Sequence, residues 1–277
     1  MQFQFSQYQY QTDAADAVCD VFDGQPLQDG VSYIRDVGIR KPVFPDPEPI
    51  QDTLFEDNRP KQATFNSYDE DDDTGYRNAD LLLTYERLLA NVKNVQRRQN
   101  LEESPKLYAD PAGAVELDVE METGTGKTFV YTKTMFELNR RYGWSKFIVV
   151  VPSIAIREGV AKSLDMTNDY FYTSGRDGNE GYGKKLHSFI YDSSSLTRLD
   201  EFAQSSDIQV MIINMQAFNT SMKENGRNKD ARIIFSERDN FGSRRPIDVI
   251  SATHPIMILD EPQKMGGKAT QAGIRLF

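Results

Sequence analysis

The chain has 277 residues, 39% of them hydrophobic, which is enough for one large domain or two small ones and excludes a peptide or a small disulfide scaffold. Cys19 is the single cysteine, so an internal disulfide and a cysteine-ligated zinc site are excluded and a reducing compartment, the cytoplasm, is expected. The net charge of −10 argues against a histone-like protein that coats nucleic acid by charge alone, and we expect neither a signal peptide nor a membrane span.

The N-terminal region predicts two helices separated by an irregular insertion. Apolar residues recur at helical spacing over residues 10–22 and again over residues 80–101. Between them, from about 24 to 80, five of the twelve prolines fall between residues 42 and 60, and an acidic run covers residues 69–73. Proline removes backbone donors and like charges repel each other, so we expect most of this insertion to be a solvated loop.

From residue 111 onward, strands alternate with helices. Residues 115–121 predict a strand, a glycine-rich turn follows, and residues 127–141 predict a helix. Continuous apolar runs are typical of strands buried on both faces of a parallel sheet, and they occur at residues 147–151, 210–213 and 256–259. The sequence therefore predicts an α/β domain over residues 111–277, a mainly parallel sheet flanked by helices, preceded by a helical region over residues 1–110 that carries the insertion.

The glycine-rich turn before the helix predicted at residues 127–141 has the form of a nucleoside triphosphate-binding loop. Its backbone N–H groups and the positive end of the following helix would converge on a β-phosphate. Lys127 would bridge the β- and γ-phosphates, and the Thr128 hydroxyl would join the shell of Mg²⁺. The strict pattern begins with glycine, where this chain has Met121, and a glycine turn with an incidental lysine is the alternative. The predicted nucleotide-binding residues of the turn are Thr123, Gly124, Thr125, Gly126, Lys127 and Thr128.

An acidic pair, Asp260 and Glu261, directly follows the last predicted strand. Asp260 would hold Mg²⁺ directly or through water, and Glu261 would orient and deprotonate the attacking water as a catalytic base. An acidic surface pair after a strand is the alternative, but the phosphate loop upstream favours a shared ATP site. The sequence thus predicts ATP and Mg²⁺ as cofactors.

Taken in order, these motifs resemble those of superfamily-two helicases, and in particular the restriction (Res) subunit of type III restriction–modification enzymes. Gln11, within YQTDA, resembles the family's glutamine motif, whose amide can donate to and accept from the edge of adenine. Residues 121–128 resemble motif I, and DEPQ at residues 260–263 resembles the Res version of motif II. The resemblance covers roughly residues 1–23 and 110–277.

Two further segments resemble nucleic-acid-contacting motifs of the same family. They are VPSIAIREGV at residues 151–160, which corresponds to motif Ia, and INMQAFN at residues 213–219. The resemblance implies four residues that contact nucleic acid: Ser153, Arg157, Asn214 and Gln216.

The resemblance also implies the fold and the biology. It implies a RecA-like P-loop domain, which would be the first motor domain of a bacterial cytoplasmic DNA translocase or helicase. The full-length protein would couple ATP hydrolysis to movement along duplex DNA. It would also cleave DNA in a complex with a methyltransferase (Mod) subunit. The sequence stops soon after motif II, so the second motor domain and the nuclease domain are expected to be absent, and slow hydrolysis is expected because an arginine finger is worth roughly 10³–10⁵ in rate. The alternatives are another superfamily-two helicase, acting on DNA or RNA, and a non-catalytic nucleotide-binding remnant.

Plainer interpretations remain for several residues. For Gln11 the alternative is a polar helix start, and for Ser153 and Arg157 it is a helix N-cap and a solvated arginine. His187 and His254 are far apart in sequence and suggest neither a metal site nor a triad. Scattered basic pairs are expected at the surface, at residues 97–98, 140–141, 184–185 and 244–245.

Overall fold

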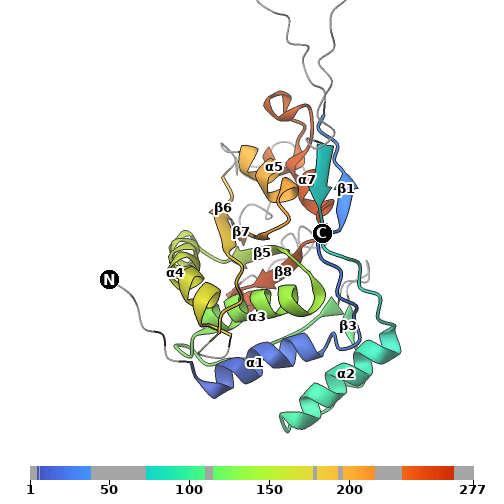
Figure 1. Ribbon diagram of the computed structural model, residues 1–277, viewed down its shortest axis with the longest axis vertical. Helices are drawn as coiled ribbons and strands as arrows, with labels where there is room; N and C mark the ends of the chain where they lie inside the picture. Colours follow the sequence, from blue (N-terminus) through green and yellow to red (C-terminus); the bar gives the residue numbers. More distant parts are fainter. Residues whose placement is uncertain are drawn as a thin grey trace, which may run out of the picture.

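The computed structural model describes residues 5, 7–38, 73–109, 115–176, 180–192, 196–215 and 233–264. Its centre is a four-stranded parallel sheet in the order β6-β7-β5-β8 (Figure 1). The strands are β5 (Lys146–Val151), β6 (Leu186–Ile190), β7 (Ile208–Asn214) and β8 (Ile256–Leu259). The predicted α/β class, a parallel sheet flanked by helices, is confirmed, and so are the strands expected at residues 147–151, 210–213 and 256–259.

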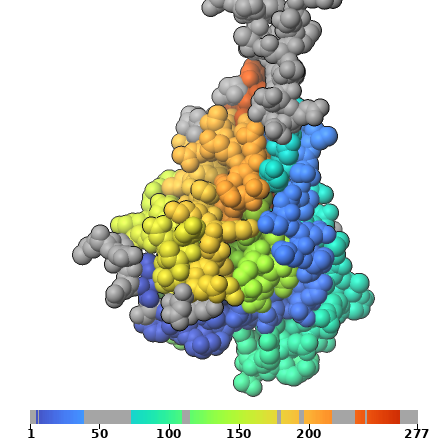
Figure 2. Space-filling model, viewed as in Figure 1, coloured from blue at the N-terminus to red at the C-terminus, as the bar shows by residue number. Residues whose placement is uncertain are grey.

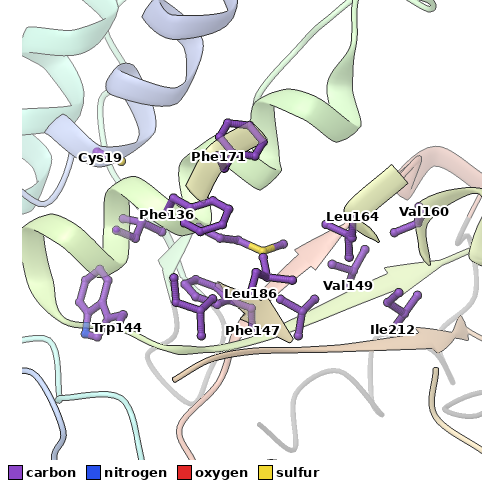
Figure 3. Close-up of a cluster of buried hydrophobic side chains, with 14 of the residues drawn as sticks. Cys19, Phe136, Trp144, Phe147, Val149, Val160, Leu164, Phe171, Leu186 and Ile212 are labelled. Carbon is purple, nitrogen blue, oxygen red and sulfur yellow. The ribbon is translucent and has the colours of Figure 1, made fainter. Parts of the chain in front are cut away.

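Helices cover both faces of the sheet. One face carries α3 (Lys127–Tyr142) and α4 (Ile154–Thr173), and the other carries α5 (Thr197–Gln204) and α7 (Pro246–Ser251). Every residue of β5 is buried, and its side chains alternate between the two faces. Phe147 and Val149 pack under α3 and α4 (Figure 3), whereas Ile148 packs toward α5 and α7. This two-sided burial explains why the strand is an uninterrupted apolar run.

The two predicted N-terminal helices form further layers outside α3. Helix α1 (Gln9–Asp20) packs directly on α3 with Ala15 and Cys19 fully buried, and α2 (Tyr85–Arg98) packs outside α1, where Figure 2 shows it at the edge of the molecule. Leu88 anchors α2 in a small apolar cluster with Val21. The division into regions 1–110 and 111–277 stays a prediction.

The described flanks of the predicted insertion, residues 24–38 and 73–80, contain two short strands and are otherwise without regular structure, as expected for most of the segment. Strands β1 (Ser32–Ile34) and β2 (Thr74–Tyr76) pair antiparallel. The buried Asn78 donates from Nδ2 to the Lys146 carbonyl oxygen at 2.8 Å and accepts from the Lys146 N–H at 2.9 Å. Such side-chain contacts with a distant strand end leave no trace in local composition. The proline-rich stretch and most of the acidic run lie outside the described residues.

The strand predicted at residues 115–121 is wrong in extent and in partner. Strand β4 covers only Val115–Glu116 and pairs antiparallel with β3 (Tyr108–Ala109) in a separate two-stranded sheet. Acidic residues at 116, 118 and 120 alternate with the apolar ones, and Val119 is 49% exposed. One face of such a strand carries acidic side chains, so the segment does not suit the burial on both faces that is seen for β5.

Several elements were not predicted: β6, α4, α5, α7 and two 3₁₀ turns, η3 (Asp239–Phe241) and η4 (Pro262–Lys264). They surround the predicted strands, and the second turn follows the acidic pair. Within the ranges that the structure describes, no helix combines the length and the apolar character needed to cross a membrane.

Candidate nucleotide-binding site

The phosphate loop lies where the sequence places it, immediately before α3. Gly126 is the N-cap of α3 and has a φ of +87°, and Gly124 has a φ of +85°. These left-handed conformations favour glycine. The Thr125 hydroxyl donates to the Glu122 carbonyl oxygen at 2.6 Å, which closes the turn. The loop is therefore followed by the free N–H groups of a 16-residue helix, a suitable environment for an anion.

Lys127, the first residue of α3, meets the acidic pair that follows β8. Its Nζ lies 3.2 Å from Glu261 Oε1, although the two residues are 134 positions apart, and it also donates to the Met121 carbonyl oxygen at 3.3 Å. The hydrogen bond from Lys127 lowers the pKa of Glu261, and Lys264 adds to the effect. The structure thus brings together Lys127 and Glu261, which the sequence assigns to one ATP site, and their roles in that site stay predictions.

The two residues of the acidic pair have different environments. The Asp260 N–H donates to the Val150 carbonyl oxygen at 2.9 Å, so its backbone extends the pairing of β8 with β5. Burial raises the pKa of Asp260, and the neighbouring charge of Glu261 raises it further. Glu261 has a φ of +58°, uncommon for a residue with a side chain, and it accepts from Gln263 Nε2 at 2.6 Å. The turn therefore holds the Glu261 carboxylate between Gln263 and Lys127.

Gln11 lies against the phosphate loop. It is 6% exposed, and its Nε2 donates to the Thr125 carbonyl oxygen at 3.0 Å. A Cβ added to Gly126 would lie 2.6 Å from the same Nε2. Tyr10, which sequence reasoning missed, donates from its hydroxyl to the Thr125 carbonyl oxygen at 3.0 Å. Gln11 therefore lies against the glycine-rich loop, and its part in nucleotide binding, including contact with adenine, stays a prediction.

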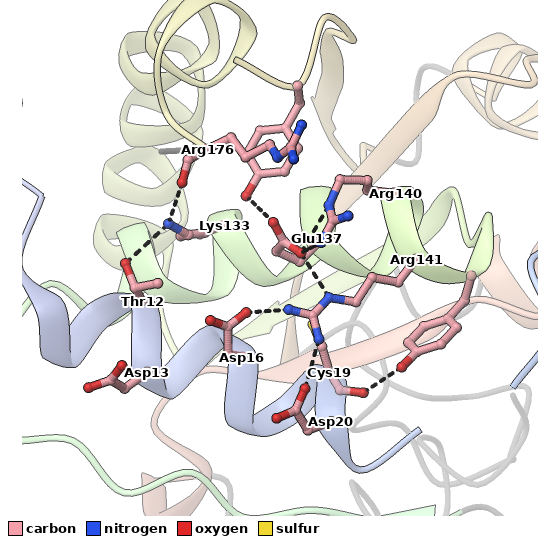
Figure 4. A network of polar contacts seen from close by, with 12 residues as sticks. Thr12, Asp13, Asp16, Cys19, Asp20, Lys133, Glu137, Arg140, Arg141 and Arg176 are labelled. Carbon is pink, nitrogen blue, oxygen red and sulfur yellow. Dashed lines mark hydrogen bonds and ion pairs between the residues drawn. The ribbon is translucent and has the colours of Figure 1, made fainter. Parts of the chain in front are cut away.

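A polar network holds α1 in this place on α3 (Figure 4). Arg141 pairs with Asp16, with Asp20 at 2.8 Å and with Glu137 at 2.9 Å. Burial by itself would raise the pKa of Glu137, but hydrogen bonds from Arg140, Tyr182 and Arg141 lower it below its usual value. One turn closer to the loop, the buried Lys133 donates to the Thr12 hydroxyl at 3.2 Å.

This network corrects one sequence interpretation. Arg141 is not a free surface charge, because its guanidinium joins two helices. The Arg244 side chain is only 9% exposed and forms a bidentate pair with Asp200 at 2.9 Å. The sequence predicts both arginines at the surface, and the structure corrects this prediction. Two acidic partners of Arg141, Asp16 and Asp20, lie at helical spacing on α1, and this signal can be interpreted only once α1 and α3 are known to be neighbours.

The residues implied to contact nucleic acid are only partly described. Ser153 is the N-cap of α4 and accepts from the Ile156 N–H at 3.4 Å, which is the plainer alternative for this residue. Arg157, one turn later, lies 2.9 Å from Glu158. Asn214 ends β7, and Gln216 lies outside the described residues. A role of these four residues in binding DNA stays a prediction.

The residues that could hold Mg²⁺ offer oxygen atoms, the ligands that this ion prefers. They are the Thr128 hydroxyl and the Asp260 carboxylate, and both act on the pKa of the same neighbour, Tyr131. Among the described residues no group of three or more His, Cys, Asp or Glu side chains could hold a metal ion. The oxygen chemistry of Thr128 and Asp260 fits Mg²⁺, which commonly completes its coordination with phosphates and water, and the presence of the ion stays a prediction.

Comparison with known proteins agrees with these motifs. The family model described as "Type III restriction enzyme, res subunit" matches residues 83–271. The EcoPI Res subunit of Escherichia phage P1 is 30% identical over 214 residues, which make up 72% of this chain and 21% of the phage protein. The EcoP15I Res subunit of Escherichia coli is 28% identical over 213 residues, again 72% of this chain and 21% of the relative. The StyLTI Res subunit of Salmonella typhimurium is 33% identical over 178 residues, 57% of this chain and 16% of the relative.

The chain thus spans about a fifth of the length of the curated relatives it matches. The family match covers more than half of the chain and includes both the phosphate loop and the acidic pair. With the parallel sheet flanked by helices, it confirms the RecA-like α/β fold that the resemblance implied. This chain belongs to the family of type III restriction enzyme Res subunits.

Proposed function

We propose that this chain binds Mg²⁺–ATP and forms the ATP-hydrolysing part of a DNA motor. The observation that carries the proposal is the contact between Lys127 and Glu261, which joins the phosphate loop to the acidic pair across 134 positions of sequence. Gln11 borders the same loop from a third segment. A glycine turn with only a structural role would not need the Lys127 amine, the Glu261 carboxylate and the Gln11 amide, which come from three separate elements.

Each residue would have a distinct task. Lys127 would bind the β- and γ-phosphates in exchange for the Glu261 carboxylate, and the loop N–H groups would bind the β-phosphate. Thr128 and Asp260 would hold Mg²⁺, which neutralises phosphate charge when bound. Once Lys127 contacts phosphate, Glu261 Oε1 is released to orient a water molecule and accept its proton.

The relatives are Res subunits of type III restriction–modification enzymes, so we assign the following biology to the complete protein. ATP hydrolysis would drive movement along duplex DNA, and cleavage would take place in a complex with the Mod methyltransferase subunit. Ser153, Arg157, Asn214 and Gln216 would contact the DNA backbone. Another superfamily-two helicase, acting on DNA or RNA, is the alternative, and DNA-specific stimulation of the complete protein separates the two.

The test is titration calorimetry of Mg²⁺–ATP on the 277-residue chain, wild type and Lys127→Ala. We expect the Lys127→Ala variant to lose binding at least tenfold, because the lysine charge faces the phosphates. Lys264→Ala is the matched control: it also contacts Glu261, at 3.4 Å, but its side chain is 59% exposed and it lies outside the loop. The control should bind like the wild type.

Phosphate release from the same samples, with and without duplex DNA, then separates an ATPase from a protein that only binds nucleotide. Turnover that depends on Lys127 supports the hydrolytic role. Equal Mg²⁺–ATP affinity in the wild type and in Lys127→Ala would refute the proposed site.

A further inference from the structure

Tyr131 lies on α3 one turn after Thr128, so the two side chains lie on the same side of the helix. Its hydroxyl oxygen is shielded from solvent and has no hydrogen-bond partner in the described part of the chain. A buried hydroxyl without a partner costs on the order of 1–3 kcal/mol. Such a group is uncommon in folded proteins and requires an explanation.

The surroundings of this hydroxyl point to the site described above. Burial raises the pKa of Tyr131, and the two other influences on it are the Thr128 side chain and the charge of Asp260. Thr128 is thus close enough to act on the phenol, although the pair falls short of hydrogen-bonding geometry. The orphaned oxygen therefore belongs to a side chain one helical turn from Thr128, and it is within range of the charge of Asp260.

The chemistry of a threonine ligand supplies a use for this oxygen. A hydroxyl that binds a cation through its oxygen must direct its hydrogen to an acceptor. A phenol can accept one hydrogen bond and donate another at the same time. Groups of this kind orient the ligands of a metal, and their removal typically costs about 10- to 100-fold in metal affinity.

We propose that Tyr131 is a positioning residue for the magnesium ligands, accepting a hydrogen bond from the Thr128 hydroxyl and donating one to the Asp260 carboxylate directly or through one water. The assignment rests on the proposed binding of Mg²⁺–ATP. Tyr131 touches neither nucleotide nor metal in this arrangement and acts only through its two neighbours.

Tyr131→Phe tests the assignment, because it removes the hydroxyl and keeps the ring. Tyr142→Phe is a matched control on the same helix, since the buried Tyr142 hydroxyl already donates to the Cys19 carbonyl oxygen at 2.8 Å. Two quantities are measured for each variant: the ratio of the ATP dissociation constants in EDTA and in Mg²⁺, and the unfolding temperature without ligand.

We expect Tyr131→Phe to weaken Mg²⁺–ATP binding about tenfold, to leave ATP binding in EDTA unchanged, and to unfold at the wild-type temperature or above it. Tyr142→Phe should unfold at a lower temperature with the affinity ratio unchanged. A wild-type ratio in Tyr131→Phe overturns the assignment, and so does a loss of folding or of stability, since the hydroxyl would then have a structural role.

The two proposals fail in different ways. Suppose that wild-type protein binds Mg²⁺–ATP, that Lys127→Ala abolishes this binding, and that Tyr131→Phe behaves like the wild type. In that case only the proposed role of Tyr131 is wrong. If wild-type binding shows no dependence on Mg²⁺ or on Lys127, the proposed function and the role of Tyr131 are both wrong.

Discussion

Gly126 is restricted both by its own backbone and by a neighbouring side chain. Its φ of +87° disfavours any residue with a Cβ, and such a Cβ would lie 2.6 Å from Gln11 Nε2. We expect Gly126→Ala to abolish Mg²⁺–ATP binding and to destabilise the fold by about 1–2 kcal/mol or more, measured by denaturant unfolding. Gly124→Ala is the comparison, because Gly124 has a φ of +85° but no atom within 4 Å of its added Cβ. An equal loss of stability in both variants would show that Gln11 does not press on the loop.

At the scale of elements, the guanidinium of Arg141 lies at the centre of the ion pairs that join α1 to α3. Arg141 pairs with three carboxylates on two helices, and the Glu137 side chain among them is only 5% exposed. Arg141→Met should lower the free energy of unfolding by about 2–3 kcal/mol, because it leaves Asp16 without its ion-pair partner and removes one of the two arginines that pair with Glu137 and with Asp20. Arg98→Met should cost below about 0.5 kcal/mol, since Arg98 is 61% exposed and pairs with Asp20 alone. Urea denaturation compares them, and similar losses would contradict this reading of the network.

At the scale of the whole molecule, Lys146 links the central strand to the far layer of helices. It is fully buried at the start of β5, and its Nζ donates to the carbonyl oxygens of Phe202, at 2.5 Å, and of Ser205 at the end of α5. Burial lowers the pKa of Lys146 from 10.5 to about 7, and the charge of Asp207 opposes this shift. The folded chain therefore releases this proton near pH 7, while the unfolded chain keeps it to about pH 10.5.

Unfolding takes up one proton at Lys146 between these two pH values, so the contribution of this residue to stability rises with pH. We expect the free energy of unfolding to gain up to about 1.4 kcal/mol per pH unit from Lys146 between pH 7 and 10. Chemical denaturation at several pH values should show this slope in wild-type protein. The control Lys162→Met, which changes an exposed lysine on α4, should show the same slope, whereas Lys146→Met should not. A slope that persists in Lys146→Met would assign the pH dependence to other groups.

Local patterns predicted the elements that depend on local physics. Three of the four core strands were predicted from uninterrupted apolar runs, since burial on both faces requires such a run. The fourth, β6, was missed because it contains His187 and Ser188 among its apolar residues. The prediction of a strand over residues 115–121 was wrong for another reason. Alternating apolar and acidic residues are compatible with several strand pairings, and the sequence does not say which one forms.

The sequence by itself determined the α/β class, the helices at both ends of the N-terminal region, the phosphate loop and the acidic pair, because these depend on residue types at short spacing. Only the tertiary structure decided which distant groups meet: Glu261 with Lys127, Gln11 with Thr125, and Arg141 with its carboxylates on α1. Contacts across 114 to 134 positions follow from the path of the chain and from the packing of whole helices, which local spacing does not encode. The buried hydroxyl of Tyr131 belongs to the same class, since its sequence neighbours alone do not reveal that the charge of Asp260 reaches it.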